Sequence, residues 1–183
     1  AAALLHDVEK RSTTVQEDDG RITSKGHARK GERTARLLLY DAYPTPFVQR
    51  EAVAKLVRYH GLPLWVFEKG SPRQALLQAS LEVNTAWLAL LARADVLGRV
   101  CADQDELLYR IDLFEEFCRE QDCWGKPYPF ASNLTRFHYF RRDDLAPDFP
   151  LYDDTKTTVV LLSGLPGVGK DHYLLSHYRD WPV

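Results

Sequence analysis

Histidine and aspartate residues recur between residues 6 and 95 in positions that suit metal coordination. His6 and Asp7 are adjacent in "ALLHDVEK", His27 lies in "SKGHARKGERTA", His60 ends "KLVRYH", and Asp95 lies in "LLARADVLG". Imidazole nitrogen combined with carboxylate oxygen suits borderline divalent ions such as Mn, Co, Ni, Zn or Fe. Because such an ion lowers the pKa of a water and holds phosphoryl oxygens, the chemistry indicated is phosphoester hydrolysis.

Each of these side chains also has a purely structural explanation. His27 could lie in a solvated basic turn, and His60 could cap a helix dipole. Asp95 is harder to explain in this way, because it has helical spacing from Leu88 and Leu91 in a segment with almost no polar face. An unpaired carboxylate there would cost several kcal/mol of desolvation, which a metal or a fixed cation would offset. The predicted metal ligands are His6, Asp7, His27, His60 and Asp95.

Asp7 and the nearby Lys10 are candidates for catalysis. Asp7 can ligate one ion or bridge two, as the neighbour of His6. Lys10 lies one helical turn beyond His6 and can neutralise phosphate charge, although it could equally be a solvated helix end. We therefore take Asp7 and Lys10 as the catalytic candidates.

A second group of residues, around position 170, has the spacing of a phosphate-binding loop. "SGLPGVGKD" matches G-x-x-x-x-G-K, in which glycines let backbone N–H groups curl around phosphates and the Lys reaches the terminal phosphates. Asp171 replaces the usual Ser or Thr ligand of Mg, and its carboxylate can hold Mg but also repels phosphate. The predicted residues for ATP and Mg are Gly164, Gly167, Gly169, Lys170 and Asp171.

Helical patterns must position the first group of residues, because they dominate the chain to about residue 142. Start signals for four helices are present, namely the N-cap candidates Ser24, Thr45, Ser71 and Asn84. The helix that starts at Asn84 is apolar on nearly all sides and should be central. Further helices are expected at about 104–119 and 132–142. The β-branched run "TTVVLLS" at 157–163 then predicts a strand, followed by a helix.

Composition limits the classes of protein that this chain can represent. It has 183 residues, 45% of them hydrophobic, and a net charge of −2 from 24 basic and 26 acidic side chains, so no global positive field indicates nucleic-acid binding. The odd set Cys101, Cys118 and Cys123 favours a reducing compartment over a disulfide framework. With no membrane-spanning run or signal sequence, we expect a cytoplasmic protein without membrane contact. The chain contains no Met, and we expect it to be a fragment that lacks residues at both ends.

The order of the His and Asp phrases resembles the HD phosphohydrolase superfamily over residues 1–120. "ALLHDVEK" is similar to the family's "LLHDIGK", "KGHARKGERTA" to "GHxxxGAxxA", "LVRYHG" to "hxxHH", and "LLARADVLG" to "LxxADxL". Glu9 departs from the pattern, because the family usually has a small Gly there. The first His of the pattern is also absent, and we expect it upstream of Ala1. The resemblance implies a helical bundle with a divalent transition metal in its centre.

The loop "SGLPGVGKD" resembles that of bacterial polynucleotide kinases of the phage type, some of which carry Asp after the Lys. Together with the HD phrases, it resembles bacterial HD-polynucleotide kinase proteins, which heal broken nucleic-acid ends. The fold class predicted is therefore mainly α, with the first strand, loop and helix of a truncated α/β kinase domain. The predicted domains are a phosphohydrolase domain at 1–122, a connector at 123–156 and the start of the kinase at 157–183.

The resemblance implies a phosphoesterase acting on 2',3'-cyclic, 2' or 3' phosphates at nucleic-acid ends, coupled to an ATP-dependent 5'-kinase. Two alternatives stay open. The first is a phosphohydrolase of free nucleotides in which the phosphate loop is a regulatory sensor. The second is a non-catalytic scaffold in which the metal motif only packs.

Overall fold

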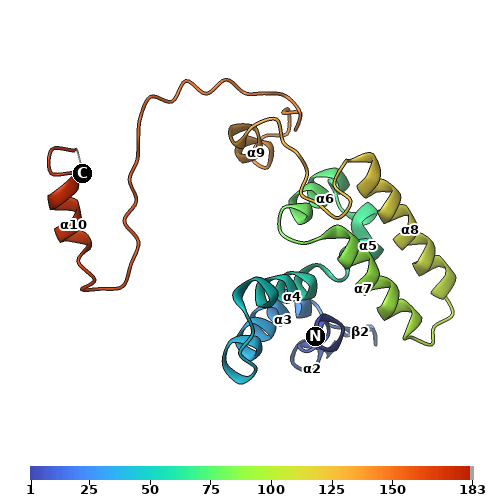
Figure 1. Ribbon diagram of the computed structural model, residues 1–183. Helices are drawn as coiled ribbons and strands as arrows, with labels where there is room; N and C mark the ends of the chain where they lie inside the picture. The colour runs from blue at the N-terminus through green and yellow to red at the C-terminus, as the bar shows by residue number, and fades with distance from the viewer. Residues whose placement is uncertain (182–183) are drawn as a thin grey trace. The chain divides into compact units, whose positions relative to one another are not determined.

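The computed structural model describes residues 1–181, and the chain divides into two compact units, Ala1–Leu151 and a second that begins at Tyr152. The first unit is mainly α, as the sequence predicts (Figure 1). Its elements are α1 (Ala2–Leu5), α2 (Lys10–Thr13), β1 (Val15–Gln16), β2 (Ile22–Thr23), α3 (His27–Leu37), the π-helical turn η1 (Leu38–Ala42), α4 (Phe47–Tyr59), α5 (Leu62–Trp65), the 3-10 turn η2 (Val66–Glu68), α6 (Pro72–Ser80), α7 (Thr85–Leu97), α8 (Gln104–Glu120) and α9 (Asn133–Tyr139). The strands β1 and β2 form a short antiparallel hairpin that the sequence did not predict.

Two helix pairs make up most of the first unit, α3 beside α4 and α7 beside α8 (Figure 1). Helix α3 approaches α4 closely because Gly31 faces it, where an added Cβ would lie 3.1 Å from Val57 Cγ1. The main core contains Leu88 from α7 and Phe114 from α8, both fully buried. Burial of each such side chain contributes about 1.5–3 kcal/mol, so this core holds the helix ends near the site in place.

Several predicted helices are confirmed, because their start signals act locally. Asn84 caps α7 by accepting a hydrogen bond from the Trp87 amide at 3.0 Å. Ser71 is the N-cap residue of α6, with Pro72 at its first position. The helices expected at about 104–119 and 132–142 are α8 and α9, the second one ending earlier than predicted.

Two predicted N-caps were wrong. Helix α3 begins at His27 with Gly26 as its N-cap instead of Ser24, because the Ser24 carbonyl accepts from the His27 ring at 2.7 Å. Helix α4 has Pro46 as its N-cap instead of Thr45. The Thr45 hydroxyl donates to the carbonyl two residues earlier, at 2.7 Å, so it is engaged in a turn.

Residues 123–151 pack on the helices of the first unit. The buried hydroxyl of Thr85 donates to the Cys123 carbonyl at 2.6 Å and accepts from the Gly125 amide at 2.8 Å. The Ser80 hydroxyl accepts from the Tyr128 amide at 3.1 Å. These bonds hold the segment that leads to α9 against the ends of α6 and α7.

The second unit contains α10 (Lys170–His177) within its described part. The strand predicted at 157–163 is not formed, so this prediction was wrong and no α/β segment is present in residues 152–181. A strand needs a neighbouring strand to pair with its backbone groups, and the described residues provide none. Within the described chain, no single helix is long and apolar enough to cross a membrane, and α6 and α7 pass that test only as a pair bent by 108°.

Candidate metal centre

Four segments of the first unit deliver the five predicted metal ligands. His6 directly follows α1, and Asp7 lies in the turn between α1 and α2. His27 is the first residue of α3, and His60 directly follows α4. Because α3 and α4 lie side by side, the start of one helix meets the end of the other. Asp95 comes from the last turns of α7, which packs against both α1 and α4.

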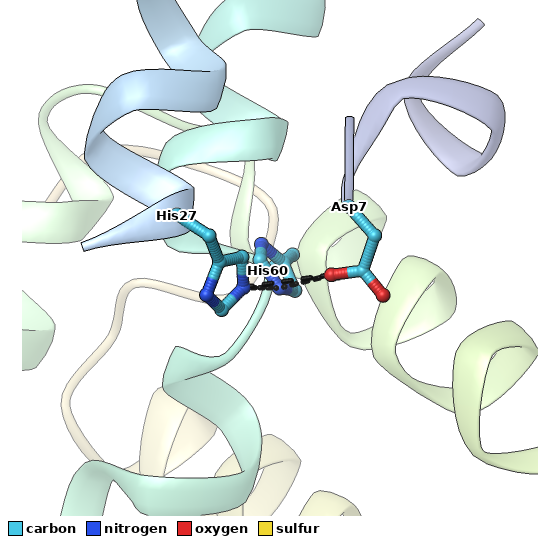
Figure 2. Close-up of side chains that lie close together, drawn as sticks. All are labelled: Asp7, His27 and His60. Atoms are coloured by element: carbon cyan, nitrogen blue, oxygen red, sulfur yellow. Dashed lines mark hydrogen bonds and ion pairs between the residues drawn. The ribbon is translucent and has the colours of Figure 1, made fainter. Parts of the chain in front are cut away.

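Asp7, His27 and His60 form a partly buried cluster that can hold a metal ion. One ligand atom from each lies within 4.8 Å of the others. The Asp7 Oδ1 atom is 3.5 Å from His27 Nε2 and 3.7 Å from His60 Nε2, and the two Nε2 atoms are 3.2 Å apart. Figure 2 shows the three side chains pointing toward one another from separate segments. The sequence spacing could not show this convergence.

The other ring nitrogen of each histidine is already engaged. The Nδ1 atoms of His6, His27 and His60 each contact a backbone carbonyl oxygen, those of Ala3, Ser24 and Val57, at 2.8, 2.7 and 2.8 Å. A carbonyl oxygen only accepts, so Nδ1 carries the proton and Nε2 of the neutral ring carries a lone pair. The lone pairs of His27 and His60 therefore face each other, an arrangement that a cation between them stabilises.

His6 and Asp95 extend this cluster. His6 Nε2 lies 3.2 Å from Asp7 Oδ2 and 3.3 Å from Asp95 Oδ1. Asp95 is also paired with Arg99, which the sequence analysis did not name. Part of the positive charge expected opposite the Asp95 carboxylate therefore comes from Arg99, one helical turn later. The spacing of four residues between these two was a readable signal for an ion pair.

Two buried acceptor atoms of the cluster have no hydrogen-bond partner among the described residues, His6 Nε2 and Asp7 Oδ1. Leaving such an atom unsatisfied costs about 1–3 kcal/mol. A divalent ion held by imidazole nitrogen and carboxylate oxygen would satisfy both atoms at once. The residues present therefore fit a borderline transition metal.

The protonation states also suit a metal. Burial works to raise the pKa of Asp7, but the hydrogen bond from Lys10 at 2.7 Å and the charge of that ammonium lower it, so the pKa lies below its usual value. For His60, burial lowers the pKa, and this outweighs the opposing effect of its bond to Val57. A carboxylate and a neutral imidazole, the forms that bind metal, are thus favoured at neutral pH.

Glu9, which departs from the HD pattern, is part of a polar network beside the cluster. Glu9 is 5% exposed, and its carboxylate accepts a hydrogen bond from Thr34 Oγ1 at 2.5 Å and pairs with Lys30 Nζ at 3.1 Å. Hydrogen bonds from Ser12, Thr34 and Lys30 lower its pKa to about 2. Since Thr34 and Lys30 belong to α3, Glu9 ties the turn that carries Asp7 to the helix that carries His27.

A cavity of about 540 Å³ opens beside the cluster, and His27, His60 and Asp95 line it. Lys10 and Arg99 also line it. The sequence pointed to Lys10 but gave no sign of the other cationic and aromatic lining residues, which are Arg58, Tyr59, Trp65, Lys69 and Arg99. Their separation along the chain carried no signal that they share a cavity.

The predicted phosphate loop lies in the second unit. Gly167 and Gly169 have positive φ angles of 76° and 90°, so the loop curls before α10 begins at Lys170. The Lys170 ammonium donates to the carbonyl oxygens of Gly164 and Leu165, both at 2.9 Å. Asp171 lies in the first turn of α10 and is exposed. The Lys170 side chain therefore folds back onto the loop, although the strand expected before the loop is not formed.

No protein-family model, curated protein or solved structure matches this chain. The structure brings together all five predicted metal ligands through contacts of 3.2 to 3.7 Å.

Proposed function

We propose that the first unit is a metal-dependent phosphohydrolase of the HD type that acts on phosphoesters at nucleic-acid ends. The observation that carries the proposal is the facing pair of Nε2 atoms of His27 and His60, 3.2 Å apart beside the Asp7 carboxylate. The order of the His and Asp phrases along the chain supports the same assignment. Under this proposal, the first unit is an HD helical bundle.

The side chains divide the work of such a site. His6, Asp7, His27, His60 and Asp95 would hold the metal. A divalent ion in this place supplies Lewis acidity toward a phosphoryl oxygen and lowers the pKa of a water. Carbonyl contacts at Nδ1 of each histidine fix the ring orientation and its tautomer, so that Nε2 stays available. Lys10, with its ammonium 2.7 Å from Asp7 Oδ2, would neutralise charge on the bound phosphate.

The second unit enters the proposal as the start of a P-loop polynucleotide 5'-kinase that uses ATP and Mg. The curled glycine loop with Lys170 folded onto it supports a phosphate-binding role. The domains proposed are the phosphohydrolase at 1–122, the connector at 123–156 and the kinase segment from 157. The partners are nucleic-acid ends and nucleotide, with no membrane, in the cytoplasm.

Hydrolysis of two substrate types tests the phosphohydrolase assignment against its alternatives. We expect the protein supplied with Mn, Co, Ni, Zn or Fe to open an oligonucleotide ending in a 2',3'-cyclic phosphate and release its phosphate. Faster release from free nucleotides would instead favour a nucleotide phosphohydrolase. Metal content after dialysis, measured by elemental analysis, separates both from a scaffold, which would bind no stoichiometric metal and hydrolyse neither substrate.

The His60→Ala variant is the matched test of the site, because it removes one lone pair and leaves the exposed surface unchanged. It should lose metal content and hydrolysis together. His138→Ala, in α9, changes a histidine outside the cluster and serves as the control. Equal hydrolysis by wild type and His60→Ala would refute the assignment.

A further inference from the structure

The cavity beside the metal cluster has a wall that metal binding does not use. Its volume of about 540 Å³ is that of a pocket for a small organic ligand, which ranges over about 300–1,000 Å³. Beyond the metal ligands, α5 lines it with Leu62, Leu64 and Trp65, and α6 adds Ala75. A site for inorganic phosphate alone would need no such apolar wall.

The charged side chains of the cavity are mainly cationic. They comprise Lys10, Arg58, Lys69 and Arg99 against the single carboxylate of Asp95. Lys10 and Arg99 are paired with the carboxylates of the metal cluster. Within residues 1–181, no carboxylate lies within ion-pair distance of Lys69. Arg58 is paired with Glu32, its Nε atom lying 3.8 Å from Oε2, so Lys69 is the cationic lining residue without a paired carboxylate among residues 1–181. The cavity thus offers an apolar wall and one uncompensated positive charge, which fits a ligand that is part planar and apolar and part anionic.

Trp65 is the aromatic residue that α5 contributes to this wall. Trp65 is 42% exposed, and the guanidinium carbon of Arg110 lies 4.8 Å from the centroid of the Trp65 ring. Arg110 is itself held by the Leu64 carbonyl at 3.2 Å and by Glu68 at 2.7 Å. Trp65 lines the cavity, whereas Arg110 does not. The contact with Arg110 restrains the indole ring, which stays partly exposed at the cavity.

We propose that Trp65 is the stacking platform for the base of a nucleoside phosphate whose phosphate lies at the metal cluster. A base stacks on an indole, and the cationic side chains of the same cavity attract the phosphate. The inference rests on the proposed phosphohydrolase function and names its substrate class. Two sources carry this chemistry, the end of a nucleic-acid strand and a free nucleotide.

Calorimetric titration of the full chain in the presence of a chelator tests the platform without requiring hydrolysis. The probes are adenosine 3'-monophosphate and ribose 5-phosphate, which lacks a base. We expect wild type to bind the nucleotide more tightly, and Trp65→Leu to weaken nucleotide binding about tenfold, equivalent to about 1.4 kcal/mol, without weakening ribose 5-phosphate binding. Leu keeps an apolar side chain but has no aromatic face, while Trp65→Phe should retain most of the nucleotide affinity.

The control is Trp87→Ala, which removes a 56% exposed indole that does not line the cavity and should change neither affinity. Equal binding of both probes by wild type, or equal weakening of both by Trp65→Leu, would overturn the platform. If the platform fails in this way, metal-dependent hydrolysis by wild type would still support the phosphohydrolase function. If wild type binds in a base-dependent way but shows no metal-dependent hydrolysis, the phosphohydrolase function is refuted. Repeating the titration with an oligonucleotide that ends in a 3'-phosphate distinguishes the sources, since a strand end should bind at least as tightly as the mononucleotide.

Discussion

The substitution Asp7→Asn separates metal binding from fold stability. Asp7 shares the space between His27 and His60, and its Oδ1 atom is buried without a hydrogen-bond partner. Asn has the same shape but one oxygen fewer and no charge. We therefore expect the variant to fold normally and to lose the response of its thermal stability to divalent ions.

The size of both effects follows from the geometry. Without metal, the variant loses the ion pair with Lys10, which is partly exposed and contributes about 0–1 kcal/mol. The new amide N–H can donate to a neighbouring Nε2 lone pair, which returns about 0.5–1.5 kcal/mol. For a chain of this size, 1 kcal/mol shifts the melting temperature by about 2–4 °C. The melting temperature of the variant in chelator should therefore lie within about 6 °C of that of wild type.

With metal at about 100 times its dissociation constant, wild type should gain about 2.7 kcal/mol, which corresponds to a rise of about 5–11 °C. Differential scanning calorimetry with Mn, Co, Ni, Zn or Fe and with chelator measures this difference. The matched control is Asp112→Asn, which changes an exposed, salt-bridged carboxylate on α8 and should keep the full rise. The reasoning fails if Asp7→Asn shows the same rise as wild type, or if none of these ions raises the melting temperature of wild type.

Three further predictions address the rest of the chain. Thr85→Val should lower the free energy of unfolding by about 2 kcal/mol in denaturant titration, because the Cys123 carbonyl and Gly125 amide lose their partner; an unchanged midpoint would contradict the docking of that segment. Burial raises the pKa of Glu32, but hydrogen bonds from Arg36 and Lys55 lower it below its usual value of 4.5, so its contribution to stability is complete above pH 4.5 and is lost as the pH falls through the lowered pKa. Glu32→Gln should therefore show a shallower loss of stability below pH 4.5 than wild type, and parallel curves would refute this. In the intact protein, Lys170→Ala should abolish 5'-kinase activity and spare phosphoester hydrolysis, and loss of both activities in a folded variant would show that the sites depend on each other.

The sequence by itself determined the features that depend on neighbouring residues. Asn84 marks a helix start because its side chain accepts from an amide only three residues away, and Ser71 with Pro72 marks another because proline suits the first helical position. The apolar pattern predicted the mainly α class, and the types of His6, Asp7 and His60 indicated metal chemistry before any geometry was known. Cap positions that compete with other local bonds, such as Ser24, were misplaced by a few residues.

Only the tertiary structure decided what these side chains face. Packing of α3 against α4 brings His27 and His60 within 3.2 Å, and carbonyl contacts at Nδ1 leave both Nε2 lone pairs free. The approach of Asp95 to His6 and the cavity wall around Trp65 also depend on helices far apart in sequence. The β-branched run at 157–163 has strand propensity but forms no strand in the described chain, because a strand requires pairing partners. A local hydrogen bond depends on residues that are close in sequence, so the sequence can predict it. The convergence of the metal-ligand side chains depends on how helices distant in sequence pack, so only the tertiary structure shows it.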